Sequence, residues 1–99
     1  MNRVTYEERL AIYQSAKASF GHTTQLTVAV EEFAELQKEI CKILRGQGDL
    51  SHLSEEIADA TIMLEQLREM FGVNEQVCLF MDEKVIRLKH RIEVSRLHR

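Results

Sequence analysis

The chain contains no proline, and its apolar residues recur every three or four positions over most of its length. Proline interrupts helices, and a three-to-four spacing places apolar side chains on one helical face. A half-buried strand would instead need alternation with a period of two. The sequence therefore predicts an all-α protein.

The chain is short enough to enclose only one modest core. Its 99 residues, 44% of them hydrophobic, predict a single domain spanning residues 1–99. No stretch approaches the ~20 consecutive apolar residues of a membrane span, and the first residues lack the apolar run of a secretory signal. We therefore expect a cytoplasmic protein without a membrane partner. Cys41 and Cys78 lie in helical patterns without CxxC spacing, which predicts buried, reduced thiols and no disulfide.

Four helical segments are predicted, at about residues 5–20, 24–45, 51–71 (starting at Ser51 or Ser54) and 74–97. The first opens with the capping-box pattern Thr5-x-x-Glu8, and the fourth is predicted to be capped by Asn74. The second and fourth carry apolar stripes that should face the core: Ala29, Phe33, Leu36, Ile40 and Ile43 in the second, and Val77, Met81, Val85, Leu88 and Ile92 in the fourth. In the third segment the steps are strictly four and three residues, along Leu53, Ile57, Ala60, Leu64, Leu67 and Phe71.

The connections between these segments indicate how they pack. A short link, Gly46-Gln47-Gly48-Asp49, joins the second and third segments and predicts an antiparallel hairpin. The fourth segment is long for this domain at ~1.5 Å per residue. Its end should pack on a second subunit or fray. The expected fold is a four-helix bundle of antiparallel hairpins, completed by dimerisation.

Charge is distributed unevenly along the chain. The net charge of −3 argues weakly against binding a nucleic acid polymer. Residues 31–83 hold thirteen acids and four Lys or Arg, whereas residues 84–99 hold six Lys or Arg and one acid. This separation predicts an acidic element and a basic element with different tasks, although an ordinary basic tail is an alternative interpretation.

Two pairs of carboxylates stand out, Glu32 with Glu35 and Glu56 with Asp59, each spaced i, i+3. On neighbouring antiparallel helices the two pairs can converge at the rim of the core. Clustered, partly desolvated carboxylates must take up protons or bind a cation. Mg²⁺ prefers oxygen ligands in octahedral geometry. The sequence therefore predicts a Mg²⁺ site, with Mn²⁺ as a substitute, formed by these four residues.

The alternative is a solvated acidic face, because glutamate is a good helix former. Like-charged i, i+4 pairs such as Glu31/Glu35 and Glu55/Asp59 argue against it. Each pair costs a few tenths of a kcal/mol where a stabilising pattern would place lysine at one end. We therefore favour the metal site.

The paired motif, Glu31-Glu32-x-x-Glu35 followed after twenty residues by Glu56-x-x-Asp59, resembles the signature of the MazG-like all-α NTP pyrophosphatases. The resemblance covers essentially the whole chain in size and helix order. It implies Mg²⁺-dependent hydrolysis of a nucleoside triphosphate to the monophosphate and pyrophosphate, in a homodimer or a dimer of dimers. It also implies ligand roles for Glu32, Glu35, Glu56 and Asp59. Catalytic roles are implied for Glu31 and Glu35, with Glu31 orienting the attacking water or a second Mg²⁺.

Substrate contacts are expected elsewhere on the chain. In the family a basic run on the last helix meets the phosphates, and Lys84, Arg87 and Arg91 occupy that place here. No GxxxxGK[ST] loop exists, so metal and side chains must hold the nucleotide. The nucleoside should lie against the first helix and the start of the second. Candidates for stacking or hydrogen bonding there, unless they belong to the core, are Tyr13, Phe20, His22 and Gln25.

A second class of function remains open: a non-catalytic, regulatory helical dimer whose acidic face binds a basic partner. Dependence on metal separates it from the enzyme. A di-iron carboxylate bundle is disfavoured because no histidine lies three positions after a glutamate. A His-Asp metal phosphohydrolase is disfavoured because the chain has no adjacent His-Asp pair.

Overall fold

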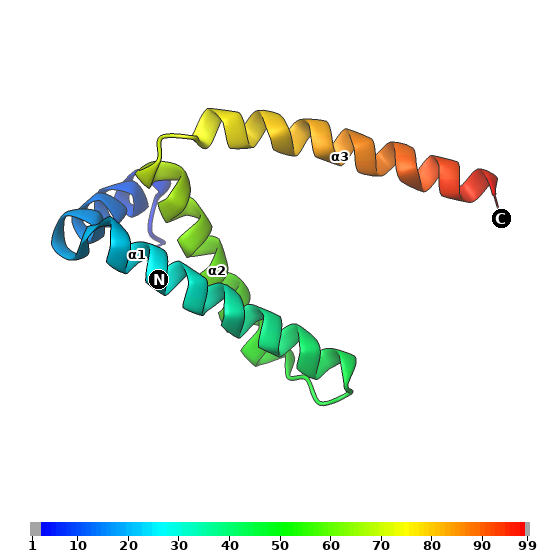
Figure 1. The fold of residues 1–99 in the computed structure, drawn as a ribbon, viewed down its shortest axis with the longest axis horizontal. Coiled ribbons are helices and arrows are strands. Elements are labelled where there is room, and N and C mark those ends of the chain that lie inside the picture. The colour runs from blue at the N-terminus through cyan, green and yellow to red at the C-terminus, as the bar shows by residue number, and fades with distance from the viewer. Residues whose placement is uncertain (1–2, 99) are drawn as a thin grey trace.

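This computed structural model describes residues 3–98 of the chain, which contain three helices and no strand. They are α1 (Tyr6–Leu44), α2 (Leu50–Met70) and α3 (Asn74–Leu97). Figure 1 shows α1 and α2 lying together as a hairpin while α3 extends away from it. The all-α prediction and the antiparallel hairpin are confirmed.

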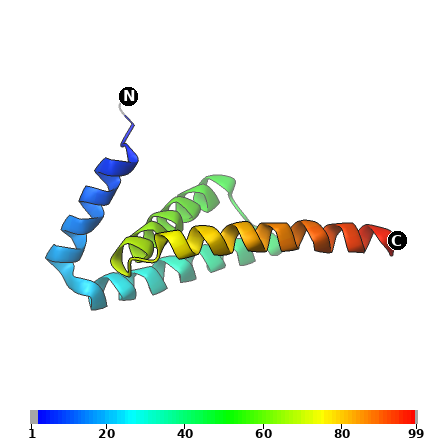
Figure 2. The same ribbon diagram turned by 90° about the horizontal axis from the view of Figure 1, so that it is seen from above.

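The first two predicted helices are joined into one element that bends at Gly21. This residue lies inside α1 with non-helical backbone angles, φ 81° and ψ 165°. Glycine adopts a positive φ without the steric cost that a Cβ imposes. The prediction of a helix end at this glycine is therefore right about the break, but the second helix begins directly after Gly21 and not near residue 24. Figure 2 shows the two arms of α1 running in clearly different directions from this point.

Side chains cap the starts of the first two helices. The Thr5 hydroxyl accepts a hydrogen bond from the Glu8 N–H at 3.1 Å, as the capping-box pattern predicted. The Asp49 carboxylate accepts from the N–H groups of Ser51 at 2.7 Å and His52 at 3.3 Å. These hydrogen bonds hold the pKa of Asp49 below its ordinary value. Asp49 therefore caps α2, which begins at Leu50.

The predicted cap at Asn74 is wrong. Val73 occupies the cap position of α3, and no side chain hydrogen-bonds there. The Asn74 Oδ1 instead accepts from Arg68 Nε at 2.7 Å, which ties the start of α3 to the end of α2. The side chain is used for a contact between helices, so it does not cap its own helix.

The turn between α1 and α2 leaves little room. Gly46, with φ 73°, ends α1, and the Gln47 N–H donates to the Lys42 carbonyl at 2.9 Å, the hydrogen bond of a Schellman motif. A Cβ on Gly48 would lie 2.9 Å from the Cα of Ile43 and closer still to its side chain. The turn therefore requires glycine at position 48 for lack of space.

Gly48→Ala is accordingly expected to lower the free energy of unfolding by about 1–3 kcal/mol, the usual cost of overpacking. Urea denaturation followed by circular dichroism measures this change. Gln47→Ala in the same turn is the control and should change the free energy of unfolding by much less. Equal stability of Gly48→Ala and the native chain would contradict this packing of the turn.

Small side chains bring α1 and α2 together. Ala29 and Ala60 are 3% and 4% exposed, and Met63 fills the space beside them. The amides of the buried Gln25 and the partly buried Gln66 pair across the interface, with Gln66 Nε2 donating to Gln25 Oε1 at 2.9 Å. The packing of α1 against α2 at these buried residues positions the acidic residues that flank the alanines.

Ion pairs fasten the first arm of α1 to the end of α2. Arg9 Nε donates to Glu65 at 3.1 Å, and the Tyr13 hydroxyl donates to the same carboxylate oxygen at 3.1 Å. One turn further along, Lys17 Nζ lies 3.2 Å from Glu69. These contacts join residues more than fifty positions apart and connect the first arm of α1 to the end of α2.

Much of the predicted core is exposed. The reason is that the helices form no second layer. In the hairpin, α1 and α2 each bury only the side that faces the other helix, and α3 has no buried residue. Cys41 and Cys78 are likewise exposed free thiols, so the prediction that they are buried is wrong. The predicted stripe residues that are exposed are Ile40, Ile43, Ile57, Leu64, Phe71, Met81, Val85, Leu88 and Ile92.

The chain is extended for its length. Its radius of gyration is 17.1 Å, against about 13 Å for a compact domain of this size. Figure 1 shows that α3 meets the hairpin at one end and then extends away from it. This extension makes the radius of gyration large. Among the described residues, no helix has the length and apolar character needed to cross a membrane.

Candidate metal centre

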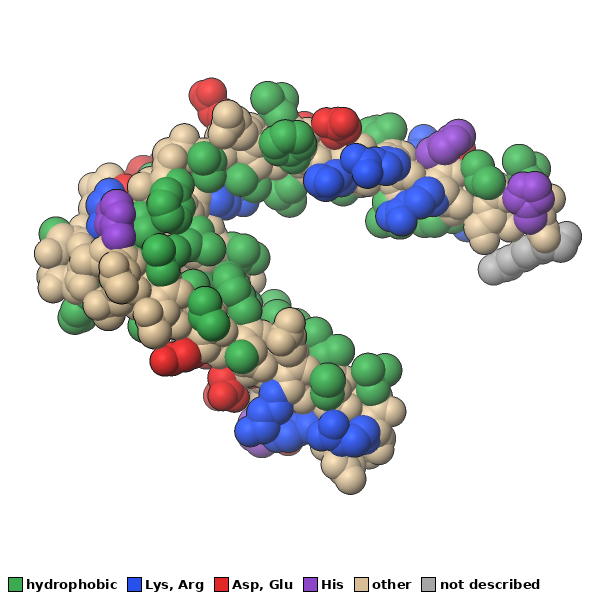
Figure 3. Space-filling model, viewed as in Figure 1, with side chains coloured by type: hydrophobic (Ala, Val, Ile, Leu, Met, Phe, Trp, Pro, Cys, Tyr) green, Lys and Arg blue, Asp and Glu red, His purple; other side chains and the backbone are tan. Residues whose placement is uncertain are grey.

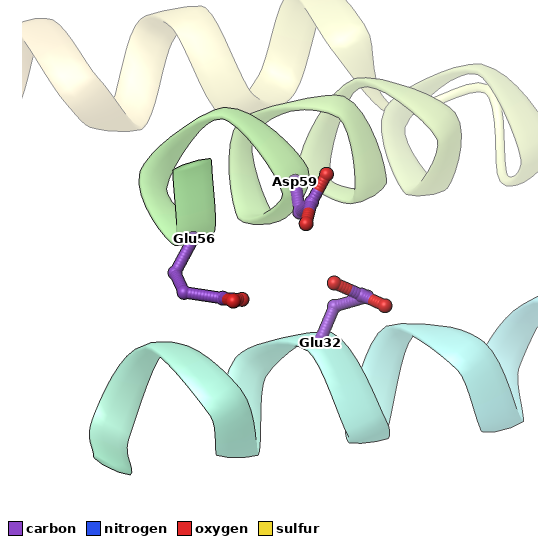
Figure 4. A group of neighbouring side chains, drawn as sticks. All are labelled: Glu32, Glu56 and Asp59. Carbon is purple, nitrogen blue, oxygen red and sulfur yellow. The ribbon is translucent and has the colours of Figure 1, made fainter. Parts of the chain in front are cut away.

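Three carboxylates converge where α1 and α2 cross. Glu32 comes from α1, and Glu56 and Asp59 come from α2. One carboxylate oxygen of each lies within 4.8 Å of the others. Figure 4 shows the three side chains pointing toward one another across the gap between the helices.

Local sequence explains this arrangement. Glu56 and Asp59 are three residues apart and so share a face of α2. Ala60 follows Asp59, and Ala29 lies one turn before Glu32, so the acids flank two buried alanines, one from each helix. The short turn after α1 sets how the two helices of the hairpin are aligned with each other. The predicted convergence of acids from the two arms is thus present for three of the four residues.

Burial and the repulsion between negative charges raise the pKa values of the two glutamates in this group. Glu32 and Glu56 are partly buried, whereas Asp59 is exposed. Burial raises the pKa of Glu32, and the charges of Asp59 and Glu56 raise it further. Burial is also the main cause that raises the pKa of Glu56, and the negative charge of Asp59 raises it further. The charged forms of both glutamates therefore lack compensation from within the chain.

One oxygen is left without any partner. The Oε2 atom of Glu56 is inaccessible to solvent and has no hydrogen bond. Within residues 3–98 it is the one buried side-chain N or O atom that lacks a hydrogen-bond partner. A buried carboxylate oxygen without a partner costs free energy unless it gains a proton or a cation. Three oxygen donors, open to solvent on the side of Asp59, suit the oxygen preference of Mg²⁺ and leave room for water and substrate.

Glu35 and Glu31 lie outside this group. Both are exposed on α1. Glu35 is near enough for its charge to raise the pKa of both Glu32 and Glu56, but its oxygens do not join the 4.8 Å group. Glu31 lies on the adjacent, solvent-facing side of the helix. The structure therefore places Glu35 beside the centre and Glu31 further from it.

The sequence analysis missed Glu39. This residue is only 7% exposed, and it forms an ion pair with Lys42 at 3.2 Å. Its charge contributes to the raised pKa of Glu56. Seven residues separate Glu39 from Glu32, so both lie on the same helical face, and this spacing could have identified it. The acidic group is thus longer along α1 than the paired motif suggests.

The basic residues expected to bind phosphate lie on α3. Lys84, Arg87 and Arg91 are exposed on α3. Within the described residues, no Cα of α3 lies within 8 Å of a Cα of α1, and α3 packs against α2 alone. A single copy of the chain does not bring these cations to the acidic centre.

The residues expected to hold the nucleoside do not form one pocket. Tyr13 is 5% exposed and its hydroxyl is used by Glu65, while the Gln25 amide is paired with Gln66. His22 packs edge-on against Phe71, with ring centroids 6.2 Å apart, and Phe20 is exposed beside the bend. None of the four lines the groove of ≈ 1520 Å³ that lies between the first arm of α1, α2 and the start of α3.

Comparison of the chain with protein-family models, with curated proteins and with solved structures gave no match. The geometry of the acidic group therefore carries the functional argument.

The raised pKa values of Glu32 and Glu56 predict how stability changes with pH when divalent metal is removed. Below the ordinary glutamate value of 4.5 both groups are protonated in the folded and the unfolded chain, and their burial costs little. As the pH rises from that value through the raised folded pKa, the unfolded chain releases its protons first, so the free energy of unfolding falls. Glu56→Gln should reduce this fall.

Urea titrations in EDTA between about pH 4 and about pH 8 measure the effect, since this range spans the ordinary glutamate pKa and values well above it. The variant should gain stability relative to the native chain as the pH rises. Parallel pH profiles for the two proteins would contradict the burial of an uncompensated carboxylate.

Proposed function

We propose that the chain is a Mg²⁺-dependent nucleoside triphosphate pyrophosphohydrolase, which releases a nucleoside monophosphate and pyrophosphate. The observation that supports it most is the convergence of Glu32, Glu56 and Asp59 around a buried oxygen without a partner. The resemblance of the motif to the MazG-like signature supports the reaction class. The same resemblance supports a four-helix, MazG-like bundle formed by two copies.

The proposed roles of the acidic residues combine their positions with the roles that the resemblance to the MazG-like signature implies. Glu32, Glu56 and Asp59 would hold the metal, and Glu35, one turn from Glu32, would lie beside them. When bound, Mg²⁺ neutralises charge on the phosphate oxygens and lowers the pKa of a bound water. Glu31 and Glu35 orient the attacking water at the α-phosphate. The exposed side at Asp59 admits the triphosphate.

The basic residues act on the other end of the substrate. Lys84, Arg87 and Arg91 hold the β- and γ-phosphates, the arginines in forked geometry and the lysine as a point charge. Because α3 does not approach α1 within one chain, these cations must come from a second copy. The nucleoside is held near the bend of α1, where Phe20 and His22 offer aromatic faces.

The test is to incubate the pure protein with a panel of ribo- and deoxyribonucleoside triphosphates and Mg²⁺, and to identify the products by mass spectrometry. Monophosphate and pyrophosphate are expected, with no turnover in EDTA. Diphosphate and phosphate would assign a different reaction class.

The alternative function is a non-catalytic, regulatory dimer with an acidic face, and the large exposed apolar area of the chain is the observation in its favour. It predicts no turnover for any triphosphate and no change of melting temperature with Mg²⁺. Since a ligand that binds only the folded state raises the melting temperature by mass action, a thermal scan with and without Mg²⁺ separates the two functions.

A further inference from the structure

Four charged residues form a row along α1. They are Glu32, Glu35, Glu39 and Lys42, and successive members are three, four and three residues apart. Steps of three and four residues place side chains above one another on one face of a helix. The row of acids therefore continues into a lysine, and this lysine lies in the last turn of α1, next to the turn of the hairpin.

Figure 3 shows the same change of charge on the surface of the hairpin. Acidic side chains lie along its lower edge, and Lys and Arg side chains follow them nearer to the turn between α1 and α2. The acidic part of the hairpin thus has cations of its own chain at one end.

An ion pair holds the ammonium of Lys42 beside the acids. Lys42 Nζ donates to Glu39 Oε1 at 3.2 Å. The Lys42 side chain therefore extends back along α1 toward the acidic residues, which is the direction that long side chains of a helix favour. The charge of Glu39 contributes to the raised pKa of Glu56, so the pair lies close to the converging carboxylates.

The ammonium of Lys42 keeps donors that face solvent. The side chain of Lys42 is 34% exposed, whereas that of Glu39 is 9% exposed. Within residues 3–98, the hydrogen bond to Glu39 is the one that this ammonium donates, and an ammonium has three N–H donors. The ion pair thus presents its positive end to solvent, with donors left for a ligand.

No other lysine or arginine of residues 3–98 is held to this row by an ion pair. Arg9 and Lys17 pair with carboxylates near the other end of α2. Lys42 is therefore the cation that the fold itself places beside the acidic centre.

The charge of the centre explains why a cation is needed there. The three converging carboxylates carry one more negative charge than a single Mg²⁺ neutralises, so the centre stays negative when the metal is bound. A triphosphate is a polyanion, and like charges repel strongly in a partly buried site. An ammonium that faces the same opening offsets this repulsion and forms charge-assisted hydrogen bonds with phosphate oxygens.

We propose that Lys42 is a further phosphate-binding residue of the acidic centre, and that it contacts the β- and γ-phosphates of the substrate. This inference rests on the proposed function, in which Glu31 and Glu35 orient the attacking water at the α-phosphate. Lys42 lies seven residues beyond Glu35, about 10 Å along the helix, and its ammonium turns back over part of that distance. The terminal phosphates therefore extend from the metal toward the turn of the hairpin.

Calorimetric titration with inorganic pyrophosphate in the presence of Mg²⁺ tests this contact, because pyrophosphate is the β,γ part of the substrate. Lys42→Met keeps the length of the side chain without its charge, and it should weaken pyrophosphate binding at least about tenfold. The rise in melting temperature with Mg²⁺ should be kept, because the carboxylates of the centre are unchanged.

Lys17→Met is the matched control. It loses an ion pair of the same length, 3.2 Å, in which the lysine is 32% exposed instead of 34%. Its partner Glu69 lies ten residues beyond Asp59 on α2, about 15 Å along the helix. Pyrophosphate binding should therefore change less than about threefold.

The double variant Glu39→Gln, Lys42→Met separates phosphate binding from the support of Glu39. It removes both charges, so no buried carboxylate loses its partner, and pyrophosphate binding should stay as weak as in Lys42→Met. Native affinity in the double variant would show that Lys42 only balances Glu39, and it overturns the inference. Native affinity in Lys42→Met, or a native chain that does not bind pyrophosphate with Mg²⁺, also overturns it.

The panel of triphosphates separates this contact from the proposed reaction. A chain that binds pyrophosphate through Lys42 but turns over no triphosphate supports the contact and overturns the reaction. Release of monophosphate and pyrophosphate, with pyrophosphate affinity unchanged in Lys42→Met, supports the reaction and overturns the contact.

Discussion

Glu56→Gln is expected to lower kcat/KM for triphosphate hydrolysis by about 100-fold or more, because the metal loses a ligand that supplies both charge and position. Glu56 carries the oxygen that has no partner in the protein, so it is the residue whose charge most requires a cation. The amide keeps the size of the side chain but removes the negative charge. The same variant should lose the rise in melting temperature that Mg²⁺ gives the native protein.

Glu55→Gln is the matched control for this variant. Glu55 is the adjacent residue on α2 and is exposed outside the group of converging oxygens. It should keep both the Mg²⁺-dependent rise in melting temperature and most of the activity. If Glu55→Gln and Glu56→Gln lose Mg²⁺ binding equally, the effect is one of general surface charge and the proposed centre is wrong.

The double variant Arg87→Ala, Arg91→Ala is expected to lower kcat/KM by about 100-fold, since charge-assisted hydrogen bonds to phosphate contribute about 1.5–3 kcal/mol each. Its Mg²⁺-dependent rise in melting temperature should be kept, because the proposed metal ligands are carboxylates of α1 and α2 and none of them is changed. Arg96→Ala, further along the same exposed helix, is the control and should retain activity.

Mixing this double variant with Glu56→Gln should restore activity. If the cations act on the partner's acidic centre, a mixed dimer contains one site with intact acids and intact cations, and equal mixing recovers about a quarter of the native activity. The mixture should first be unfolded and refolded together so that the chains exchange. No recovery, with mixed dimers demonstrated by mass spectrometry, would show that each chain uses its own cations.

Local sequence rules account well for the helices and for most of the centre. The absence of proline and the three-to-four apolar spacing were enough to predict helices, because both features act within one or two turns. The i, i+3 spacing of Glu56 and Asp59 and the short turn after Ile43 were enough to bring these acids toward Glu32. Each of these predictions depends on neighbours close in sequence or on a turn of few residues.

The remaining features depend on interactions that a local pattern does not contain. The row through Ile57 and Leu64 has the spacing of a core seam, but periodicity does not say which element covers the row, and both residues are exposed. Glu39 is buried because the α1–α2 packing continues beyond the paired motif. Asn74 binds Arg68 across the turn between helices, a contact that its own capping preference does not predict.

The most direct measurement of the central claim is a crystal structure of the protein grown with Mn²⁺, with anomalous scattering recorded at the manganese edge. The account predicts one strong anomalous peak between α1 and α2, bound by carboxylate oxygens of Glu32, Glu56 and Asp59, and its loss in the Glu56→Gln variant. Side chains turned apart into solvent with no peak between them would contradict it.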